Sequence, residues 1–97
     1  MAKITWTAEA QRWLKEIHDY IAADNPGAAA RTVAGIVDRA EILSRFPEIG
    51  YRYRTDRHIR ALLYGHYRIA YVVKPPGDVD VLGVFHSALD IRKHLET

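Results

Sequence analysis

The fold is decided by residues 67–73, Tyr-Arg-Ile-Ala-Tyr-Val-Val. β-branched and aromatic side chains dominate this stretch, and these residue types favour β-strands. Its nearly continuous apolar content predicts a strand in the middle of a sheet. Arg68 is the exception, because a charge in a central strand must face an open surface, a partner carboxylate or a ligand. The simplest partner would be an acidic side chain on a neighbouring helix.

Strands are also predicted on both sides of this stretch. Residues 58–64 precede it across a tight turn at Gly65-His66, and residues 79–86 follow it after the turn-forming Pro75-Pro76-Gly77-Asp78. Three strands joined by such short connections form an antiparallel meander. Residues 48–57, in which Tyr and Arg alternate, are predicted to be a connection.

The first half of the chain is predicted to be helical apart from a short strand at residues 3–6. Thr7 is suited to cap the first helix, and Asn25 followed by Pro26 is suited to start the second, which Pro47 ends. Apolar side chains recur at helical spacing in both segments, so the two helices are expected to form an antiparallel hairpin with one apolar side. The recurring positions are Ala10, Trp13, Leu14, Ile17, Tyr20 and Ile21 in the first helix, and Ala29, Val33, Ile36, Val37, Ala40, Leu43 and Phe46 in the second.

A final short helix is predicted from Ser87, with Asp90 near its start and Ile91 and Leu95 on one side. The expected order of elements is therefore β-α-α-β-β-β-α. This is an α+β fold, an antiparallel twisted sheet with the helical hairpin packed on one face and the other face partly open. Residues 1–97 are expected to form a single domain.

The composition excludes several classes of protein. The 97 residues are 48% hydrophobic and 27% charged, which suits one core and is not the composition of a disordered chain. There are no cysteines, so disulfides, thiolate metal sites and a cysteine nucleophile are excluded. No apolar run is long enough to cross a membrane and the N-terminus has no apolar signal core, so a cytoplasmic protein with no membrane partner is expected.

The net charge of +2 hides a local basic segment. Residues 51–68 hold five arginines and one acid, which gives this segment a charge of +4. Such a segment is typical of a surface for a phosphate-rich or acidic partner, although arginines in a solvated loop would look the same. Tyr51 and Tyr53 alternate with Arg52 and Arg54, an arrangement that lets rings stack on bases while guanidinium groups hold phosphates. The five arginines are Arg52, Arg54, Arg57, Arg60 and Arg68.

Few residues indicate a catalytic centre. His86 ends the last predicted strand, where an imidazole can act as a general acid or base; a hydrogen bond to the following turn is the alternative. No phosphate-binding loop, dinucleotide fingerprint or nucleophile elbow is present, and the five histidines show no metal-ligand spacing. Neither a metal nor another cofactor is expected.

The order of elements and several short motifs resemble the RelE/ParE superfamily, the toxins of type II toxin–antitoxin modules, also called plasmid stabilisation proteins. The resemblance covers nearly the whole chain and rests on the order and spacing of the motifs together. These motifs are Trp6-Thr7-Ala8-Glu9-Ala10, Asp24-Asn25-Pro26, Phe46-Pro47-Glu48-Ile49-Gly50, Tyr67-Arg68-Ile69-Ala70-Tyr71-Val72-Val73 and Val84-Phe85-His86-Ser87-Ala88-Leu89-Asp90-Ile91.

The resemblance implies a toxin that inhibits growth until a cognate antitoxin wraps it, with DNA bound only through the antitoxin. RelE-like members cleave mRNA on the ribosome without a metal. In that branch Arg68 matches the arginine of the strand motif, and His86 and Arg60 are the other candidate catalytic residues. ParE-like members instead poison DNA gyrase by binding and have no known hydrolytic chemistry.

Three features favour the ParE-like branch. The long, acid-flanked helical hairpin resembles that of ParE, and so does the ending from His86 to Asp90. No lysine lies between residues 51 and 68, whereas RelE-like chains carry several around the site. The prediction is therefore a gyrase-poisoning toxin, with an mRNA interferase as the alternative, so whether the chain is an enzyme stays open. A non-enzymatic RNA- or protein-binding domain is a third alternative. The residues expected to contact the antitoxin or the target are Arg52, Arg54, Arg57, Tyr51 and Tyr53.

Overall fold

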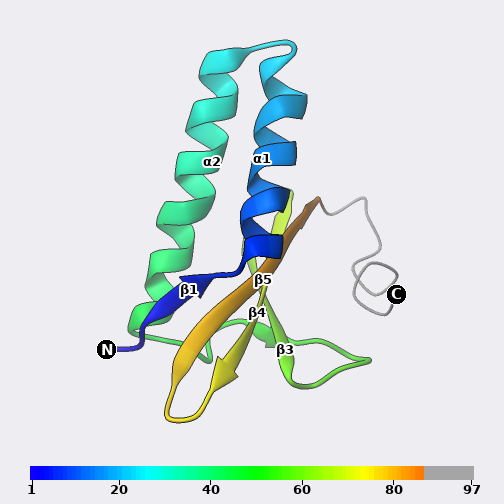
Figure 1. Cartoon of the computed structure of the whole chain (residues 1–97). Helices are drawn as coiled ribbons and strands as arrows, with labels where there is room; N and C mark the ends of the chain where they lie inside the picture. Colours follow the sequence, from blue (N-terminus) through cyan, green and yellow to red (C-terminus); the bar gives the residue numbers. More distant parts are fainter. Residues whose placement is uncertain (87–97) are drawn as a thin grey trace.

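The computed structural model describes residues 1–86, which form a helical hairpin on a five-stranded sheet (Figure 1). The predicted final helix from Ser87, including Asp90, lies outside the described residues. The helices are α1 (Ala8–Ala22) and α2 (Pro26–Ala40), followed by the 3₁₀ turn η1 (Glu41–Ser44). The strands are β1 (Ile4–Trp6), β2 (Tyr51–Arg52), β3 (Ile59–Tyr64), β4 (Tyr67–Lys74) and β5 (Asp78–His86).

Both helices begin where the sequence predicts. The Thr7 hydroxyl accepts a hydrogen bond from the Ala10 N–H at 3.1 Å, and the Asn25 side chain accepts one from Ala28 at 3.0 Å. The end of the second helix was predicted less well, because α2 stops at Ala40 and gives way to η1. The tighter 3₁₀ turn alters the direction of the following side chains. Phe46 is 57% exposed and Tyr20 of the first helix is 76% exposed, so neither belongs to the buried apolar stripe in which the sequence placed them.

The sheet has the strand order β1-β5-β4-β3-β2, with β4 in the predicted central position. Strands β3, β4 and β5 form the predicted antiparallel meander. The sheet as a whole is mixed rather than wholly antiparallel, because β1 pairs parallel with β5. Residues 51 and 52 form β2 at the edge, where a simple connection was expected. No local sequence pattern predicts either pairing, because β1 and β5 are more than seventy residues apart in the chain and β2 is only two residues long.

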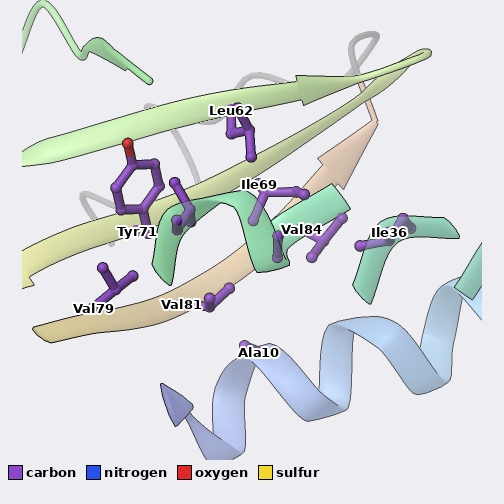
Figure 2. Packing of buried hydrophobic residues seen from close by; sticks show 10 residues of the cluster. Ala10, Ile36, Leu62, Ile69, Tyr71, Val79, Val81 and Val84 are labelled. Atoms are coloured by element: carbon purple, nitrogen blue, oxygen red, sulfur yellow. The ribbon is translucent and has the colours of Figure 1, made fainter. Parts of the chain in front are cut away.

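The core lies between the hairpin and one face of the sheet (Figure 2). Both helices contribute to it, and so do the three strands of the meander. Neither α1 nor α2 is long and apolar enough to cross a membrane. The fully or almost fully buried members of this core are Ala10, Ile36, Ala40, Leu43, Leu62, Ile69, Tyr71, Val79, Val81 and Val84.

Tyr71 is the largest buried side chain and joins the core to the chain before β2. Its hydroxyl accepts a hydrogen bond from the Gly50 N–H at 2.9 Å. The contact leaves no space for a side chain at position 50, since a Cβ there would lie 2.6 Å from the Tyr71 hydroxyl and 2.7 Å from the Ala61 carbonyl. Gly50 is therefore required by close approach rather than by an unusual backbone conformation.

Tyr71 also makes stability depend on alkaline pH. Burial raises the pKa of Tyr71 above its ordinary value, against the smaller lowering effects of the Gly50 hydrogen bond and the Arg60 charge. The folded chain thus holds this proton more tightly than the unfolded chain. The stabilisation that comes from protonated Tyr71 is fully present below the ordinary tyrosine pKa of about 10. It is lost as the pH rises through the pKa of Tyr71 in the folded chain.

We therefore expect the free energy of unfolding to fall above about pH 10, more steeply in the wild type than in Tyr71→Phe. Urea titrations followed by circular dichroism at a series of alkaline pH values measure this difference. The comparison controls for the other tyrosines, because the phenylalanine variant keeps all of them. Equal slopes in the two proteins would show that Tyr71 does not cause the alkaline loss.

Candidate functional site

The face of the sheet away from the helices, which we call the open face, carries the candidate site. In β4, Ile69 and Tyr71 point into the core beneath the helices, so strand alternation places Arg68 and Ala70 on the open face. Pairing across the sheet puts Leu63 of β3 on one side of Arg68 and Phe85 of β5 on the other. Arg68 thus lies in an apolar frame.

Part of the open face is covered by a small second cluster. Ala70 and Phe85 are buried there, packed against Trp13, Tyr53 and Ile59. The ring centroids of Trp13 and Phe85 are 4.7 Å apart, with the ring planes tilted by 59°. Trp13 comes from α1 and therefore reaches the cluster from the helical side. The cluster fixes the Phe85 ring that frames Arg68.

Arg68 lacks the partner that the sequence suggested for it. Its Nε is buried and makes no hydrogen bond. No acidic side chain within residues 1–86 forms an ion pair with it. An ion pair with a helix acid is therefore wrong as an explanation of this residue, because the helices cover the opposite face. A buried donor without an acceptor costs free energy in the isolated chain.

His86 lies on the face that the helices cover, because it pairs with Tyr67 while Phe85 pairs with Arg68. Its ring meets the Tyr67 ring edge-on with centroids 5.4 Å apart, and stacks near His66 at 5.9 Å. His86 also lines a groove of about 470 Å³ between α1 and the adjoining ends of β4 and β5. The predicted acid or base and the predicted phosphate-binding arginine therefore lie on opposite faces of the sheet.

Arg60 is also directed away from Arg68. It pairs across the sheet with Tyr71, a residue of the core face. One guanidinium nitrogen donates to the Glu48 carbonyl at 3.0 Å and to the Gly50 carbonyl at 2.8 Å. Arg60 thus anchors the segment before β2, and the three candidate catalytic residues are not brought together.

Arg60→Ala is expected to destabilise the fold by about 1–2 kcal/mol, because two carbonyl groups lose a charged donor. Growth inhibition at a temperature well below the melting temperature should remain. Thermal melting and a growth assay of the same variant test both parts. A stable but inactive Arg60→Ala protein would instead support a direct role of this side chain in function.

The basic segment is divided between different parts of the surface. Arg52 pairs with Arg60 and shares its side of the sheet, whereas Tyr51 pairs with Ala61 and lies on the open face, 44% exposed. Tyr53 also lies on the open face, against the second cluster. Arg54 and Arg57 are exposed in the loop between β2 and β3. Of the five residues predicted to contact the antitoxin or the target, only Tyr51 and Tyr53 lie on the open face with Arg68.

Sequence reasoning did not include Leu63 and Phe85 in the site. A signal for the first was present, because Leu62 and Leu63 are adjacent in a strand and must face opposite sides. Leu62 is buried in the core, and Leu63 is 51% exposed on the open face. Within residues 1–86 no group of three or more histidine or acidic side chains is placed to hold a metal ion.

Comparison with known proteins identifies the family. Residues 4–91 match the family described as ParE toxin of type II toxin-antitoxin system, parDE. The chain belongs to the ParE toxin family. It is 38% identical over 87 residues to the putative toxin Y4kP of Sinorhizobium fredii (strain NBRC 101917 / NGR234), which covers 88% of each protein. The RelE/ParE resemblance predicted from the sequence is thereby confirmed.

Solved structures agree with the ParE-family fold. A chain of the chromosomal ParDE system from P. aeruginosa superposes with a TM-score of 0.76 at 22% identity, covering 89% of this chain and 96% of that one. A chain of the RelBE2 toxin–antitoxin complex from Mycobacterium tuberculosis gives 0.69 at 26% identity, with 88% and 96% covered. The predicted α+β class is confirmed, with the mixed sheet described above.

The geometry limits what this ParE-family site can do chemically. The open face combines the Arg68 cation with exposed apolar side chains, Leu63 and Tyr51. Such a surface is suited to binding an acidic and apolar partner. The candidate acid or base, His86, lies across the sheet, so the predicted residues do not form one reaction centre.

Proposed function

We propose that this ParE-family chain is the toxin of a type II toxin–antitoxin module and that it inhibits growth by binding and poisoning DNA gyrase. The observation that carries the proposal is the separation of Arg68 from His86 and Arg60. Cleavage of RNA through its 2′-hydroxyl needs a base, an acid and a cation within hydrogen-bond reach of one phosphate. A function that depends on binding needs no such centre.

An antitoxin is the proposed neutralising partner. The support comes from the open face, where apolar side chains surround an arginine, and from relatives whose structures are described as toxin–antitoxin systems or complexes. An antitoxin segment with apolar and acidic residues would complement this surface. In this proposal the toxin acts in the cytoplasm and binds DNA only through its antitoxin.

A ribosome-dependent mRNA interferase is the second candidate. It is favoured by the likeness to a chain of the RelBE2 complex and by the position of Arg68 in a strand whose sequence resembles the RelE-like motif. In that case Arg68 would bind the scissile phosphate. The acid and base would then have to come from residues other than His86 and Arg60, or from the ribosome.

The two targets are separated by expressing the toxin alone and measuring gyrase supercoiling and mRNA ends in the same cells. We expect growth arrest, loss of supercoiling activity in a purified gyrase assay, and no new codon-phased mRNA cuts. Coexpression of the antitoxin is the control and should restore growth and supercoiling together.

Normal supercoiling with codon-phased cuts would contradict the gyrase proposal and support the interferase. Normal growth on expression of folded, soluble toxin would contradict both and leave the RNA- or protein-binding domain. Arg68→Ala adds a further distinction, because it should abolish growth inhibition if Arg68 serves cleavage of RNA. In a gyrase-binding toxin, growth inhibition by this variant should persist.

A further inference from the structure

The Arg68 side chain holds a buried polar atom that no other described residue satisfies. Its Nε is a hydrogen-bond donor of a guanidinium group and makes no hydrogen bond. Buried donors are almost always paired in folded proteins, so a donor without an acceptor needs an explanation. The simplest explanation is an acceptor that belongs to a partner molecule.

The surroundings of Arg68 indicate the chemistry of that partner. Leu63 and Phe85 flank it across the sheet, and Ala70 follows it on the same face. Lys74, another cation on this face, is paired with Asp80 at 3.1 Å, at the far end of β4. Among the cations of β3, β4 and β5 in the described part of the chain, only Arg68 is left without a partner on this face, so the acceptor meets its charge within an apolar frame.

We propose that Arg68 binds one carboxylate of the antitoxin, presented between apolar side chains that pack on Leu63 and Tyr51. This inference rests on the proposed function, because it takes an antitoxin as the partner. The planar guanidinium group matches a carboxylate through two parallel hydrogen bonds. A partner that covers Leu63 and Tyr51 would exclude water from this position, which would strengthen those charge-assisted bonds.

A nucleic-acid strand fits this position less well. Its repeated phosphates favour several cations side by side, and affinity grows with the number of phosphates neutralised. Arg60 is directed to the other face and donates to backbone carbonyls, while Lys74 is paired. A peptide with one acid between apolar residues matches both the charge and the exposed apolar area.

The proposal has a consequence for the isolated toxin. If Arg68 is kept for a partner, the free chain gains nothing from it and carries the cost of its unsatisfied donor. Arg68→Met, which keeps the length of the side chain and removes the donor, should melt at the same temperature as the wild type or at a higher one. A clearly lower melting temperature would show that Arg68 supports the fold, and would overturn the proposal.

Binding is tested with the purified antitoxin of the same module by calorimetry. Arg68→Gln should weaken the complex roughly 30-fold or more, as expected when one partner of a buried charge pair is removed. Arg68→Lys should bind with intermediate affinity, because it keeps the charge and loses the paired hydrogen bonds. The matched control is Arg31→Gln, an exposed arginine of α2 that should change affinity by less than about threefold.

A charge exchange identifies the carboxylate. Each acidic residue of the antitoxin is changed to arginine in turn and tested against Arg68→Glu toxin. One of these antitoxin variants should bind Arg68→Glu toxin at least tenfold more tightly than the unchanged antitoxin does. Restoration by none would overturn the assignment of a single carboxylate.

Three results of these experiments distinguish a failure of this inference from a failure of the proposed function. If wild-type toxin inhibits growth and Arg68→Gln binds the antitoxin as tightly as the wild type, only the present inference fails. If Arg68→Gln keeps its antitoxin affinity but loses binding to an RNA oligonucleotide, the ligand is a phosphate and the proposal is overturned. If wild-type toxin neither inhibits growth nor binds the antitoxin, the proposed function itself fails.

Discussion

Replacing Tyr71 by alanine is expected to remove a large part of the stability of the fold, about 4 kcal/mol or more. Tyr71 is fully buried between the sheet and the helical hairpin, so truncation leaves a cavity that neighbouring side chains can fill only in part. It also removes the acceptor of the Gly50 N–H, a buried hydrogen bond of 2.9 Å. A domain of this size has only about 5–15 kcal/mol of stability in total.

The two contributions of Tyr71 are separated by Tyr71→Phe. This variant keeps the ring and loses only the hydroxyl, so it should cost about 1–3 kcal/mol, the penalty of an unpaired buried donor. Urea denaturation followed by tryptophan fluorescence measures both variants. If the phenylalanine variant were as unstable as the alanine variant, the hydrogen bond rather than packing would dominate at this position.

Phe85→Ala is expected to cost about 3–5 kcal/mol and to disturb the open face at the same time. Phe85 is 1% exposed, and its ring packs against Trp13 with centroids 4.7 Å apart. Aromatic pairs of this kind contribute beyond the apolar area that they bury. Since Phe85 also flanks Arg68, its loss should loosen the frame of the arginine and weaken antitoxin binding.

Chemical denaturation measures the stability of Phe85→Ala. Trp6 and Trp13 both contribute to the tryptophan emission, which should shift to the red as Trp13 becomes exposed. Tyr20→Ala is the matched control, because Tyr20 is 76% exposed and its truncation should change stability by less than about 0.5 kcal/mol. A Phe85→Ala protein as stable as this control would mean that the second cluster does not contribute to the fold.

Local signals predicted most of the elements correctly. Thr7 and Asn25 are caps whose side chains accept hydrogen bonds from the first turn of the helix that follows, and both effects depend on adjacent residues. The turn at Gly65 was likewise predicted, and this glycine has a φ of 57°, a conformation that glycine adopts without a steric penalty. The strand from Tyr67 was placed in the centre of the sheet because of its apolar content, and the observed strand order confirms this.

The candidate site was predicted less well, because membership of a face depends on register. Arg60 and Arg68 lie in neighbouring strands, and the local sequence does not show which face of the sheet each occupies. The pairing of Arg60 with Tyr71 and of Arg68 with Leu63 assigns them to opposite faces. A shift by one residue would reverse each assignment, and no local pattern excludes it. The same reason explains why His86 lies beside α1 rather than beside Arg68.

The class of fold, the caps and turns, the central strand and the resemblance to RelE/ParE toxins can all be inferred from the amino-acid sequence alone. These features depend on residue type and on spacing over a few positions. The parallel pairing of β1 with β5, the division of the basic segment and the unsatisfied Nε of Arg68 became evident only in the folded chain. They depend on strand register and on contacts between distant residues, which form only when the helical hairpin covers one face and leaves Arg68 on the other.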